Sequence, residues 1–524
     1  MVETVQAIKQ KIVEVLNRYW EEPNIVISLT SFLYINESSF FSLIYFAKNI
    51  RRYSELGFVF YCKFIRLCLK INQMSEKPYS NITILLITLI LAVGAIYYFS
   101  NPKPQHYYDY TFRVADNILN GAVAFEEKQP SWLNEFVPFE GNWYSVFPLG
   151  SVLTMMPFAF FKLIGAIKEM PAAFISALTA SVICLFLLLI AKRYEIDWGK
   201  RILLALGILF GTWMWTNETM AGAWQLALGF AMLGELGAIY FTIYDKRPLL
   251  AGFFFAIAFG NRTEILLTAP IFMFLLLYSL KFKVQSSKLE AEVSDLQENG
   301  SAKKKHKHKP KNKASETQSI RSEISNLKSE TIRNPQFAIR NLIKFCAVPF
   351  VLGVLTLIYN YVRFHSFTDF GYARIPGVLD EPWYNHGIFS LYYIPGQAWE
   401  MLLKLWESKP KFPFLVPNGF SSSILFSSPF LFLLLRNGSS DKILKYAAWL
   451  AIIILTFLLW THGNSGGWQF GYRYAMVLLP WIFVVLLENS PKKITLSEMV
   501  FYPISFLLNA YSIYLFHWSE YIKS

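Results

Sequence analysis

Three ionisable residues with the spacing of one helix face lie in the segment 106–121 (HYYDYTFRVADNILNG): Asp109, Arg113 and Asp116. In a helix, positions i, i+4 and i+7 lie on the same side, so the two carboxylates would bracket the guanidinium. We predict that Asp109 is a general base that deprotonates an acceptor hydroxyl. The alternative is a carboxylate that the helix dipole favours at an N-terminus. Asp116 is predicted either as a second catalytic acid or, more simply, as the ion-pair partner of Arg113.

The composition is that of a polytopic membrane protein. The chain has 524 residues, of which 54% are hydrophobic, 17% aromatic and 16% charged, whereas about a quarter of a soluble domain is charged. The net charge of +13 comes from basic residues between hydrophobic segments and in one long loop, so we predict no nucleic-acid partner. The four cysteines have no zinc-type spacing and indicate no disulfide framework.

Hydropathy predicts an all-α bundle of about 11 transmembrane helices, the first over 82–99. The segment 148–167 is apolar enough to cross, but it contains Pro148, Pro157 and Lys162. If it lies instead on the outer surface as a juxtamembrane helix, the basic connectors all fall on the cytoplasmic side, as the positive-inside rule requires. The other spans are then predicted at 172–191, 201–216, 224–244, 248–260, 265–281, 343–361, 421–436, 444–461, 474–487 and 499–517.

Four regions follow from this pattern. Residues 1–80 form a cytoplasmic extension that is partly amphipathic, either lying on the inner leaflet or folded as a small cap. Residues 81–282 form an N-terminal transmembrane module, with the catalytic loop at 101–171. Residues 283–341 form a basic cytoplasmic loop too poor in apolar residues for a core, which predicts disorder. Residues 342–518 form a C-terminal module with an outward loop at 362–420. The extracytoplasmic loops hold most of the unusual polar residues, so the chemistry is expected on that side of the cell membrane.

Two arginines at predicted outer boundaries are candidates for binding a phosphate. Arg262 follows a short span and could hold a phosphate with two hydrogen bonds, unless it pairs with Glu264 or Glu218. Arg473 follows the glycine-rich loop in THGNSGGWQFGYRY. Backbone amides and a guanidinium suit a phosphate ligand, although a plain turn between helices gives the same signal.

The remaining candidates, which include Arg113 of the first outward loop, are substrate-binding residues in the outward loops. Trp143 and Tyr144 could stack on a sugar or anchor the chain at the interface. Arg374 and His386 in the large loop could bind the donor or the acceptor. Four loop glutamates together with Asp109 could form a weak divalent-cation site, without a spacing diagnostic for one; these are Glu126, Glu127, Glu135 and Glu140. No other cofactor is indicated.

The order of these motifs resembles the GT-C membrane glycosyltransferases, specifically the family-39-like group of protein O-mannosyltransferases and aminoarabinose transferases. The resemblance covers about residues 80–490 and rests on Asp109 with ADNILNG, NWYSVFPLGSVLTMMPF, FGTWMWTNETMAGAWQLALGF, RPLLAGFFFAIAFGNRTEILLTAP, YNYVRFHSFTDFGY and GWQFGYRYAMVLLP. It implies a polyprenyl-phosphate-linked sugar donor, inverting transfer, Asp109 as base, and Arg262 or Arg473 at the lipid phosphate. Many members have Asp-Glu where this chain has Asp109 followed by Tyr110.

The leading hypothesis is therefore an integral membrane glycosyltransferase whose acceptor is a glycan, a lipid or a protein. Membrane lipids are the other expected partners. Phosphate-loop, dinucleotide and zinc motifs do not occur, which argues against a nucleotide-driven pump. A transporter or flippase of lipid-linked saccharides is the main alternative, and it would be expected to carry ionisable residues at mid-span. A scaffold acting through the lysine-rich loop is the third.

Overall fold

The computed structural model describes residues 79–278 and 335–522, and it is mostly helical. The expectations for the N-terminal extension and the basic loop therefore lie, but for a few residues, outside the described part. Contacts divide the chain into two units, and the described residues of the smaller one are Trp406–Val416. That unit contains the hairpin of β3 (Glu407–Ser408) and β4 (Leu415–Val416). All that follows concerns the larger unit.

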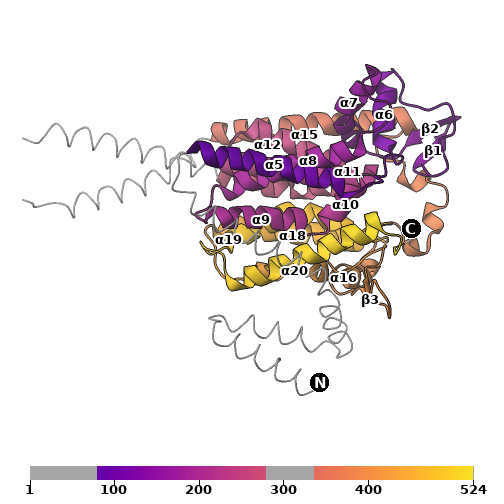
Figure 1. Cartoon of the computed structure of the whole chain (residues 1–524). Helices are drawn as coiled ribbons and strands as arrows, with labels where there is room; N and C mark the ends of the chain where they lie inside the picture. The colour runs from indigo at the N-terminus through magenta and orange to yellow at the C-terminus, as the bar shows by residue number, and fades with distance from the viewer. Residues whose placement is uncertain (1–78, 279–334, 523–524) are drawn as a thin grey trace, which may run out of the picture. The chain divides into compact units, whose positions relative to one another are not determined.

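Helices form most of the described part of this unit (Figure 1). The α-helices are α5 (Tyr79–Ser100), α6 (Tyr110–Leu119), α7 (Leu149–Leu163), α8 (Ala172–Ala191), α9 (Trp198–Phe210), α10 (Met214–Met220), α11 (Ala223–Ile239), α12 (Pro248–Asn261), α15 (Pro335–Phe364), α16 (Ile394–Leu402), α17 (Ile424–Ser427), α18 (Lys442–Thr461), α19 (Leu479–Glu488) and α20 (Leu496–Ile513). The main 3-10 segments are η2 (Thr263–Thr268), η7 (Leu391–Tyr393), η8 (Pro429–Leu435) and η9 (Arg473–Leu478). Strands β1 (Phe136–Phe139) and β2 (Asn142–Ser145) pair antiparallel.

Six of the described helices are long and apolar enough to cross a membrane: Thr83–Ser100, Ala172–Ala191, Ala223–Tyr244, Gln336–Phe364, Lys442–Thr461 and Leu496–Trp518. Each corresponds to a predicted span. The described parts of the other five predicted spans are mostly helical, but these helices are shorter or broken. For example, 201–216 becomes the 13-residue α9 and part of α10, and 421–436 becomes α17 and η8. Several apolar helices of membrane length indicate a membrane protein, and the finer count of eleven spans remains a prediction.

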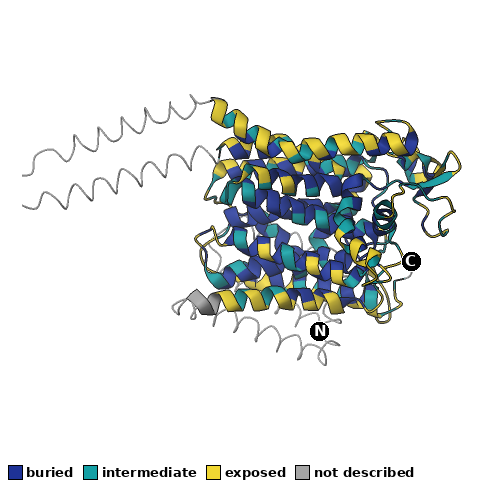
Figure 2. Ribbon diagram, turned by 90° about the horizontal axis from the view of Figure 1, so that it is seen from above, coloured by how far each residue is buried: buried dark blue, intermediate teal, exposed yellow. Residues whose placement is uncertain are grey.

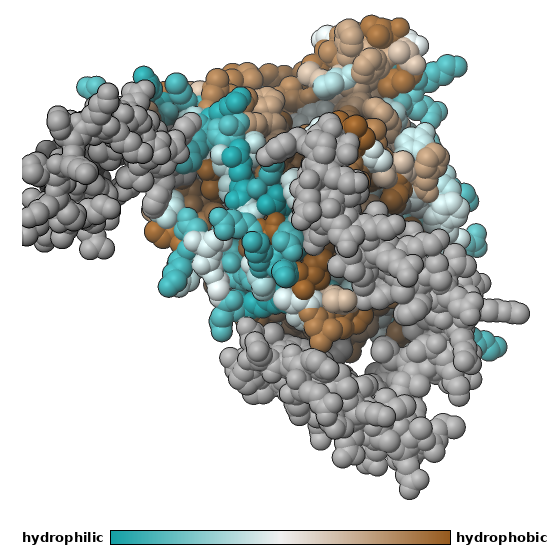
Figure 3. All heavy atoms as spheres, turned by 60° about the vertical axis from the view of Figure 1, so that its left-hand side comes forward, coloured by the Kyte–Doolittle hydropathy of each residue, from teal (hydrophilic) through white to brown (hydrophobic). Residues whose placement is uncertain are grey.

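The helices run side by side and give the unit two distinct ends (Figure 1). At one end lie α6, α7 and the β1–β2 hairpin; α7 begins directly after Pro148, where the sequence predicts a helix start. The basic connectors that precede α9, α12, α18 and α20 lie at the other end. In Figure 3 that other end is turned forward, and hydrophilic side chains gather there beside hydrophobic flanks. The alternation of apolar helices and basic connectors thus produces a bundle with one basic end.

Burial increases from the outer helices to the centre of the bundle (Figure 2). In the most apolar stretch of α15 only 17% of residues are buried, whereas in that of α11 72% are. Such a contrast between exposed apolar helices and a closely packed interior is expected when lipid solvates the outer surface. Glycines allow the closest approaches. A Cβ atom on Gly150 of α7 would lie 2.3 Å from Cα of Gly260 in α12, so only glycine fits there.

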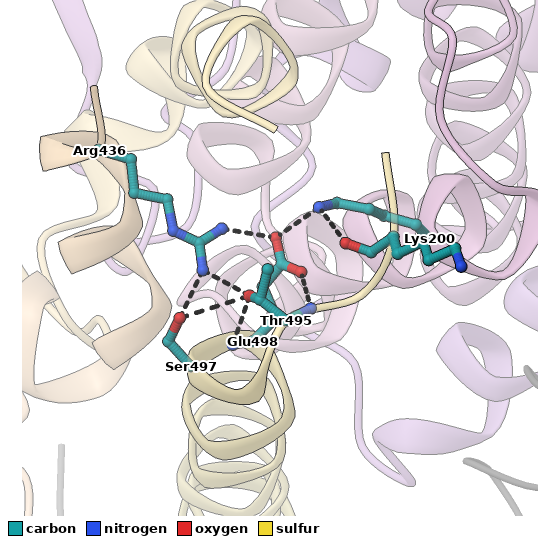
Figure 4. Close-up of polar contacts among 6 residues, drawn as sticks. Lys200, Arg436, Thr495, Ser497 and Glu498 are labelled. Carbon is teal, nitrogen blue, oxygen red and sulfur yellow. Dashed lines mark hydrogen bonds and ion pairs between the residues drawn. The ribbon is translucent and has the colours of Figure 1, made fainter. Parts of the chain in front are cut away.

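A buried polar cluster ties α9 to α20 and to the segment before α18 (Figure 4). Lys200 Nζ and Arg436 Nη1 lie 3.0 and 2.7 Å from the same oxygen, Oε1 of Glu498. Arg436 also donates to Thr495 and Ser497, and Thr495 forms a capping box with Glu498 at the start of α20. Lys200 and Glu498 are almost completely buried. Two buried cations therefore depend on one carboxylate, which makes this cluster a fixed part of the fold.

Candidate functional site

Asp109 stands at the start of α6, as its N-cap residue, and forms an ion pair with Arg113 one turn later. Arg113 Nη2 lies 3.0 and 3.1 Å from the two carboxylate oxygens, and Nε donates to Oδ1 at 3.2 Å. Because the carboxylate is engaged by Arg113, it caps no backbone N–H of α6. The predicted helix and the shared face of Asp109 and Arg113 are both present.

Asp116 does not pair with Arg113, and the predicted pairing is wrong. Its Oδ2 lies 2.6 Å from Nζ of Lys162, near the end of α7. Arg113 is occupied by Asp109, while the packing of α7 along α6 brings a second cation to Asp116. The two carboxylates thus have separate partners, and Asp116 links two helices.

The environment of Asp109 favours a basic carboxylate. Burial raises the pKa of Asp109 above its ordinary value, and the charge and hydrogen bonds of Arg113 oppose that rise without cancelling it. The side chain keeps 17% of its surface exposed. A carboxylate that is partly desolvated but still reachable suits proton abstraction.

Trp224, at the start of α11, connects Asp109's neighbours to a second carboxylate. The rings of Tyr108 and Tyr110 each lie 5.1 Å from the Trp224 ring. The indole N–H donates to both oxygens of Glu135, at 2.9 Å each. Burial raises the pKa of Glu135 to about 7, while the Trp224 hydrogen bond and the charge of Arg473 oppose that rise. Glu135 is therefore a second titratable group, bonded to Trp224 and influenced by the charge of Arg473.

The two arginines predicted to hold a phosphate meet at one aromatic ring. The guanidinium carbons of Arg262 and Arg473 lie 4.8 and 5.2 Å from the ring centroid of Tyr474. Arg262 also forms an ion pair with Glu264 at 2.7 Å, one of the alternatives the sequence left open. Arg473 is buried and forms no ion pair within the described residues, where its Nε also lacks a hydrogen-bonding partner. Arg262 thus has a carboxylate in direct contact, whereas Arg473 has none among the described residues and interacts with Glu135 only at longer range.

Buried amide side chains fix the loop that carries Arg473. Gln469 accepts from the Arg473 backbone N–H at 2.7 Å and donates to the carbonyl of Ser465 at 2.8 Å. Asn217 of α10 donates to the carbonyl of Phe470 at 2.7 Å and accepts from its N–H at 3.2 Å. The glycine-rich loop is therefore ordered by side chains, and it is not a plain turn.

His462 lies beside the same arginines. Its ring centroid is 5.9 Å from that of Tyr474 and 5.8 Å from that of Tyr384. Burial lowers the pKa of His462, and the charges of Arg262 and Arg473 lower it further. Neutral imidazole and the Tyr372–Tyr384 hydroxyl pair, 2.9 Å apart, add uncharged hydrogen-bonding groups around the arginines.

The other predicted binding residues have partners of their own. Trp143 and Tyr144 lie in β2, where Trp143 bonds to the backbone of Phe125 and Tyr144 packs against Phe364. Arg374 pairs with Asp369 at 2.7 Å and lies over the Phe139 ring. The exposed His386 ring packs on Tyr392 with centroids 4.0 Å apart. The structure gathers Arg262 and Arg473, but no contact joins Arg374 or His386 to them within the described residues.

Residues 79–278 and 335–522 contain no group of three or more His, Cys, Asp or Glu side chains that could hold a metal ion. The predicted grouping of Asp109 with the loop glutamates is not present there, since Glu135 bonds to Trp224.

Sequence reasoning missed Trp224, Tyr474 and His462, and it named Glu135 only as one of four loop glutamates of a possible cation site. Among four loop glutamates, nothing in the sequence singles out Glu135. Tyr474 was the most accessible to prediction, because it directly follows Arg473.

No family model, curated protein or solved structure matches the chain. The resemblance to GT-C glycosyltransferases therefore remains a prediction, and the case for function rests on the chemistry of these side chains.

Proposed function

We propose that this chain is a membrane glycosyltransferase that moves a sugar from a polyprenyl-phosphate-linked donor to an acceptor hydroxyl, with inversion. The observation that carries the proposal is a series of interactions that leads from the basic carboxylate of Asp109 to the buried guanidinium of Arg473, which forms no ion pair within the described residues. Trp224 packs on Tyr108, which precedes Asp109, and donates to Glu135, and the charge of Arg473 acts on Glu135. A base and an anion-binding group are the two functions that such a transfer requires.

In the proposed reaction, the Asp109 carboxylate removes the proton of the acceptor hydroxyl. The hydroxyl oxygen forms a bond to the anomeric carbon as the bond from that carbon to the phosphate oxygen breaks. The electron pair of the broken bond leaves with the phosphate, and the lipid carrier is released as a polyprenyl phosphate. Arg473 stabilises the charge that develops on the leaving oxygen.

Arg262 has a supporting role in this proposal. Its charge is balanced by Glu264, and it lies over the same ring as Arg473. It orients Tyr474 and contributes a second guanidinium to the edge of the phosphate site. In this proposal the donor phosphate is bound by Arg473 and, in addition, by Arg262, which Glu264 also engages.

The proposal includes the membrane arrangement expected from the sequence. The end with α6 and α7 faces the outside of the cell membrane, and the basic end faces the cytoplasm. The bundle crosses about eleven times, with the shorter apolar helices completing it. Labelling of single introduced cysteines at Glu127 and at Lys445 with a membrane-impermeant reagent tests this arrangement. Outside-only labelling at 127 supports it, and outside labelling at 445 contradicts it.

The test of function is incubation of the purified protein with a panel of polyprenyl-phosphate sugars. We expect release of the sugar from at least one donor, and loss of that release in Asp109→Asn. If Asp109→Asn released sugar at an unchanged rate, Asp109 would not be the general base. No release from any donor, together with movement of intact lipid-linked saccharide across vesicles, would replace transfer by transport.

Two buried carboxyl groups favour the alternative function, transport of lipid-linked saccharides. Glu235 lies in the apolar stretch Ala223–Tyr244 and is completely buried; one oxygen accepts from Trp481, and the other lacks a partner within the described residues. Glu218 of α10 is equally buried, with no hydrogen-bonding partner there for either oxygen. Ionisable residues at such depth are common in transport pathways. Under this alternative, Glu235→Gln abolishes movement of the lipid, whereas under the proposed transfer it leaves the sugar-release chemistry in place.

A further inference from the structure

The apolar outer face of α16 and of the preceding η7 is largely exposed, although its Tyr392 ring packs on His386. Its exposed residues follow the spacing of one helix side, with exposed fractions of 68% for Leu391, 70% for Tyr392, 59% for Trp399 and 54% for Leu403. The opposite side is buried through Gln397 and Met401. This segment is therefore amphipathic, with large apolar and aromatic side chains turned away from the protein.

The charges of this segment are turned away from its apolar face. Glu400 and Lys404 are the only Asp, Glu, Lys or Arg residues in 391–405, and their charged atoms lie 3.5 Å apart. Both also bond to the hydroxyl of Ser421, Lys404 as donor at 3.1 Å and Glu400 as acceptor at 2.8 Å. On a surface that faces water, charged side chains could point outward without cost. If the apolar face lies in lipid, charged side chains must point away from it, as Glu400 and Lys404 do.

The neighbouring helix α18, which contacts α16, carries a stripe of exposed apolar residues of its own. Tyr446, Leu450, Ile453 and Phe457 are 68%, 49%, 59% and 53% exposed and recur at i, i+4, i+7 and i+11. α18 is long and apolar enough to cross a membrane. At its end, the Trp460 indole N–H lies 3.3 Å from the sulfur of Met401 in α16. The α18 stripe that lipid would cover therefore ends beside α16, next to the buried side of that helix.

We propose that α16 and η7 lie in the interfacial layer of the bilayer, with Leu391, Tyr392, Trp399 and Leu403 inserted at the level of the lipid headgroups. Trp and Tyr prefer this layer because their rings combine an apolar body with a polar group. Short amphipathic helices bind there through their buried apolar area. The proposal does not depend on the activity proposed above.

This placement has a consequence for the candidate site. From the buried side of α16, Gln397 donates to the carbonyl of Gly463 at 2.9 Å and accepts from the Tyr472 hydroxyl at 2.7 Å. These two residues belong to the loop that ends at Arg473. A helix held at the bilayer surface therefore fixes the depth of the Arg473 loop relative to the lipid headgroups.

Spin labels on single cysteines test the proposal in phosphatidylcholine proteoliposomes. Cys62, Cys68 and Cys346 are replaced by serine, and the fully buried Cys184 is retained. Labels are introduced by Tyr392→Cys, Trp399→Cys and Leu403→Cys. Exposed Glu127→Cys serves as the aqueous reference and Ile453→Cys as the reference for a lipid-covered face.

We expect oxygen to collide with labels at 392, 399 and 403 more often than a water-soluble nickel complex does, by several-fold, with depths between those of 127 and 453. A preference for the nickel complex at 399 and 403, as at 127, would overturn the proposal. Protection from both reagents would also overturn it, because it would show a protein partner or a second copy on this face. The two reference variants, labelled at 127 and 453 and measured in the same kind of proteoliposome, establish that the bundle is inserted.

Discussion

Lys162 Nζ lies 2.6 Å from Asp116 Oδ2, and this ion pair joins α7 to α6 across 46 positions of sequence. This ion pair distinguishes Asp116 from Asp109, although the sequence presents the two as equivalent carboxylates on one helix face. Asp116 is held in a contact between helices, whereas Asp109 is paired within its own helix and keeps a raised pKa. The two residues therefore make a matched comparison.

Asp109→Asn is expected to lower sugar transfer by about 10²- to 10⁴-fold, the typical effect of losing a general base. Asp116→Asn removes the same charge from the same helix and is expected to reduce transfer far less. Initial rates at equal membrane abundance measure both. Equal losses in the two variants would contradict a specific role for Asp109.

Glu135→Gln is expected to make thermal stability less sensitive to pH. The folded-state pKa of Glu135, about 7, exceeds its ordinary value of 4.5, so the folded protein binds this proton more tightly than the unfolded chain. The wild type therefore loses stability relative to the variant as pH rises from about 4.5 to about 7, and the difference is constant above that. Unfolding temperatures in detergent across this range measure it, with exposed Glu127→Gln as control. An increase in the stability of the wild type relative to the variant as pH rises over this range would contradict the raised pKa of Glu135.

Arg473→Gln is expected to weaken binding of a radiolabelled polyprenyl phosphate by about 10- to 100-fold, since a charge-assisted hydrogen bond contributes about 1.5–3 kcal/mol. Arg262→Gln should have a smaller effect because Glu264 already balances Arg262. Arg374→Gln, which removes a guanidinium paired with Asp369, is the control. If the Arg374 variant lost as much affinity as the Arg473 variant, the phosphate site would lie elsewhere.

Glu498→Gln is expected to lower the free energy of unfolding by about 3–5 kcal/mol, because it leaves Lys200 and Arg436 buried without their shared carboxylate. Ser497→Ala, which removes one neutral partner of Arg436, should cost about 1 kcal/mol. Thermal unfolding of both variants in the same detergent gives the comparison. Similar losses would mean that the carboxylate is not what holds the cluster.

Gly150→Ala is expected to destabilise the protein by about 1–3 kcal/mol, the usual effect of overpacking. The added methyl group would meet the backbone of Gly260 at 2.3 Å and push α7 away from α12. Gly353→Ala in α15 meets nothing within 4 Å and is the control; it should be neutral or slightly stabilising. An unfolding temperature for Gly150→Ala equal to that of Gly353→Ala would contradict the close contact.

The sequence by itself determined the class of protein and the positions of its main helices. Hydropathy alone located the six helices of membrane length in the described part of the chain, because an apolar run of that length has few other stable environments. Local spacing also sufficed for the pair of Asp109 and Arg113, whose distance is set by one turn of helix. The start of α7 after Pro148 followed from the chemistry of proline.

Only the tertiary structure decided which distant residues meet. Asp116 took Lys162 as its partner because α7 packs along α6, and no spacing rule reaches across 46 residues. Arg262 and Arg473 were each weak candidates in sequence, and their meeting at Tyr474 depends on the packing of segments more than two hundred residues apart. Glu135 became distinct from the other loop glutamates only when Trp224 and burial changed its environment. Electrostatic interactions and desolvation depend on distance in space and not in sequence, so the candidate site could be recognised only from the folded chain.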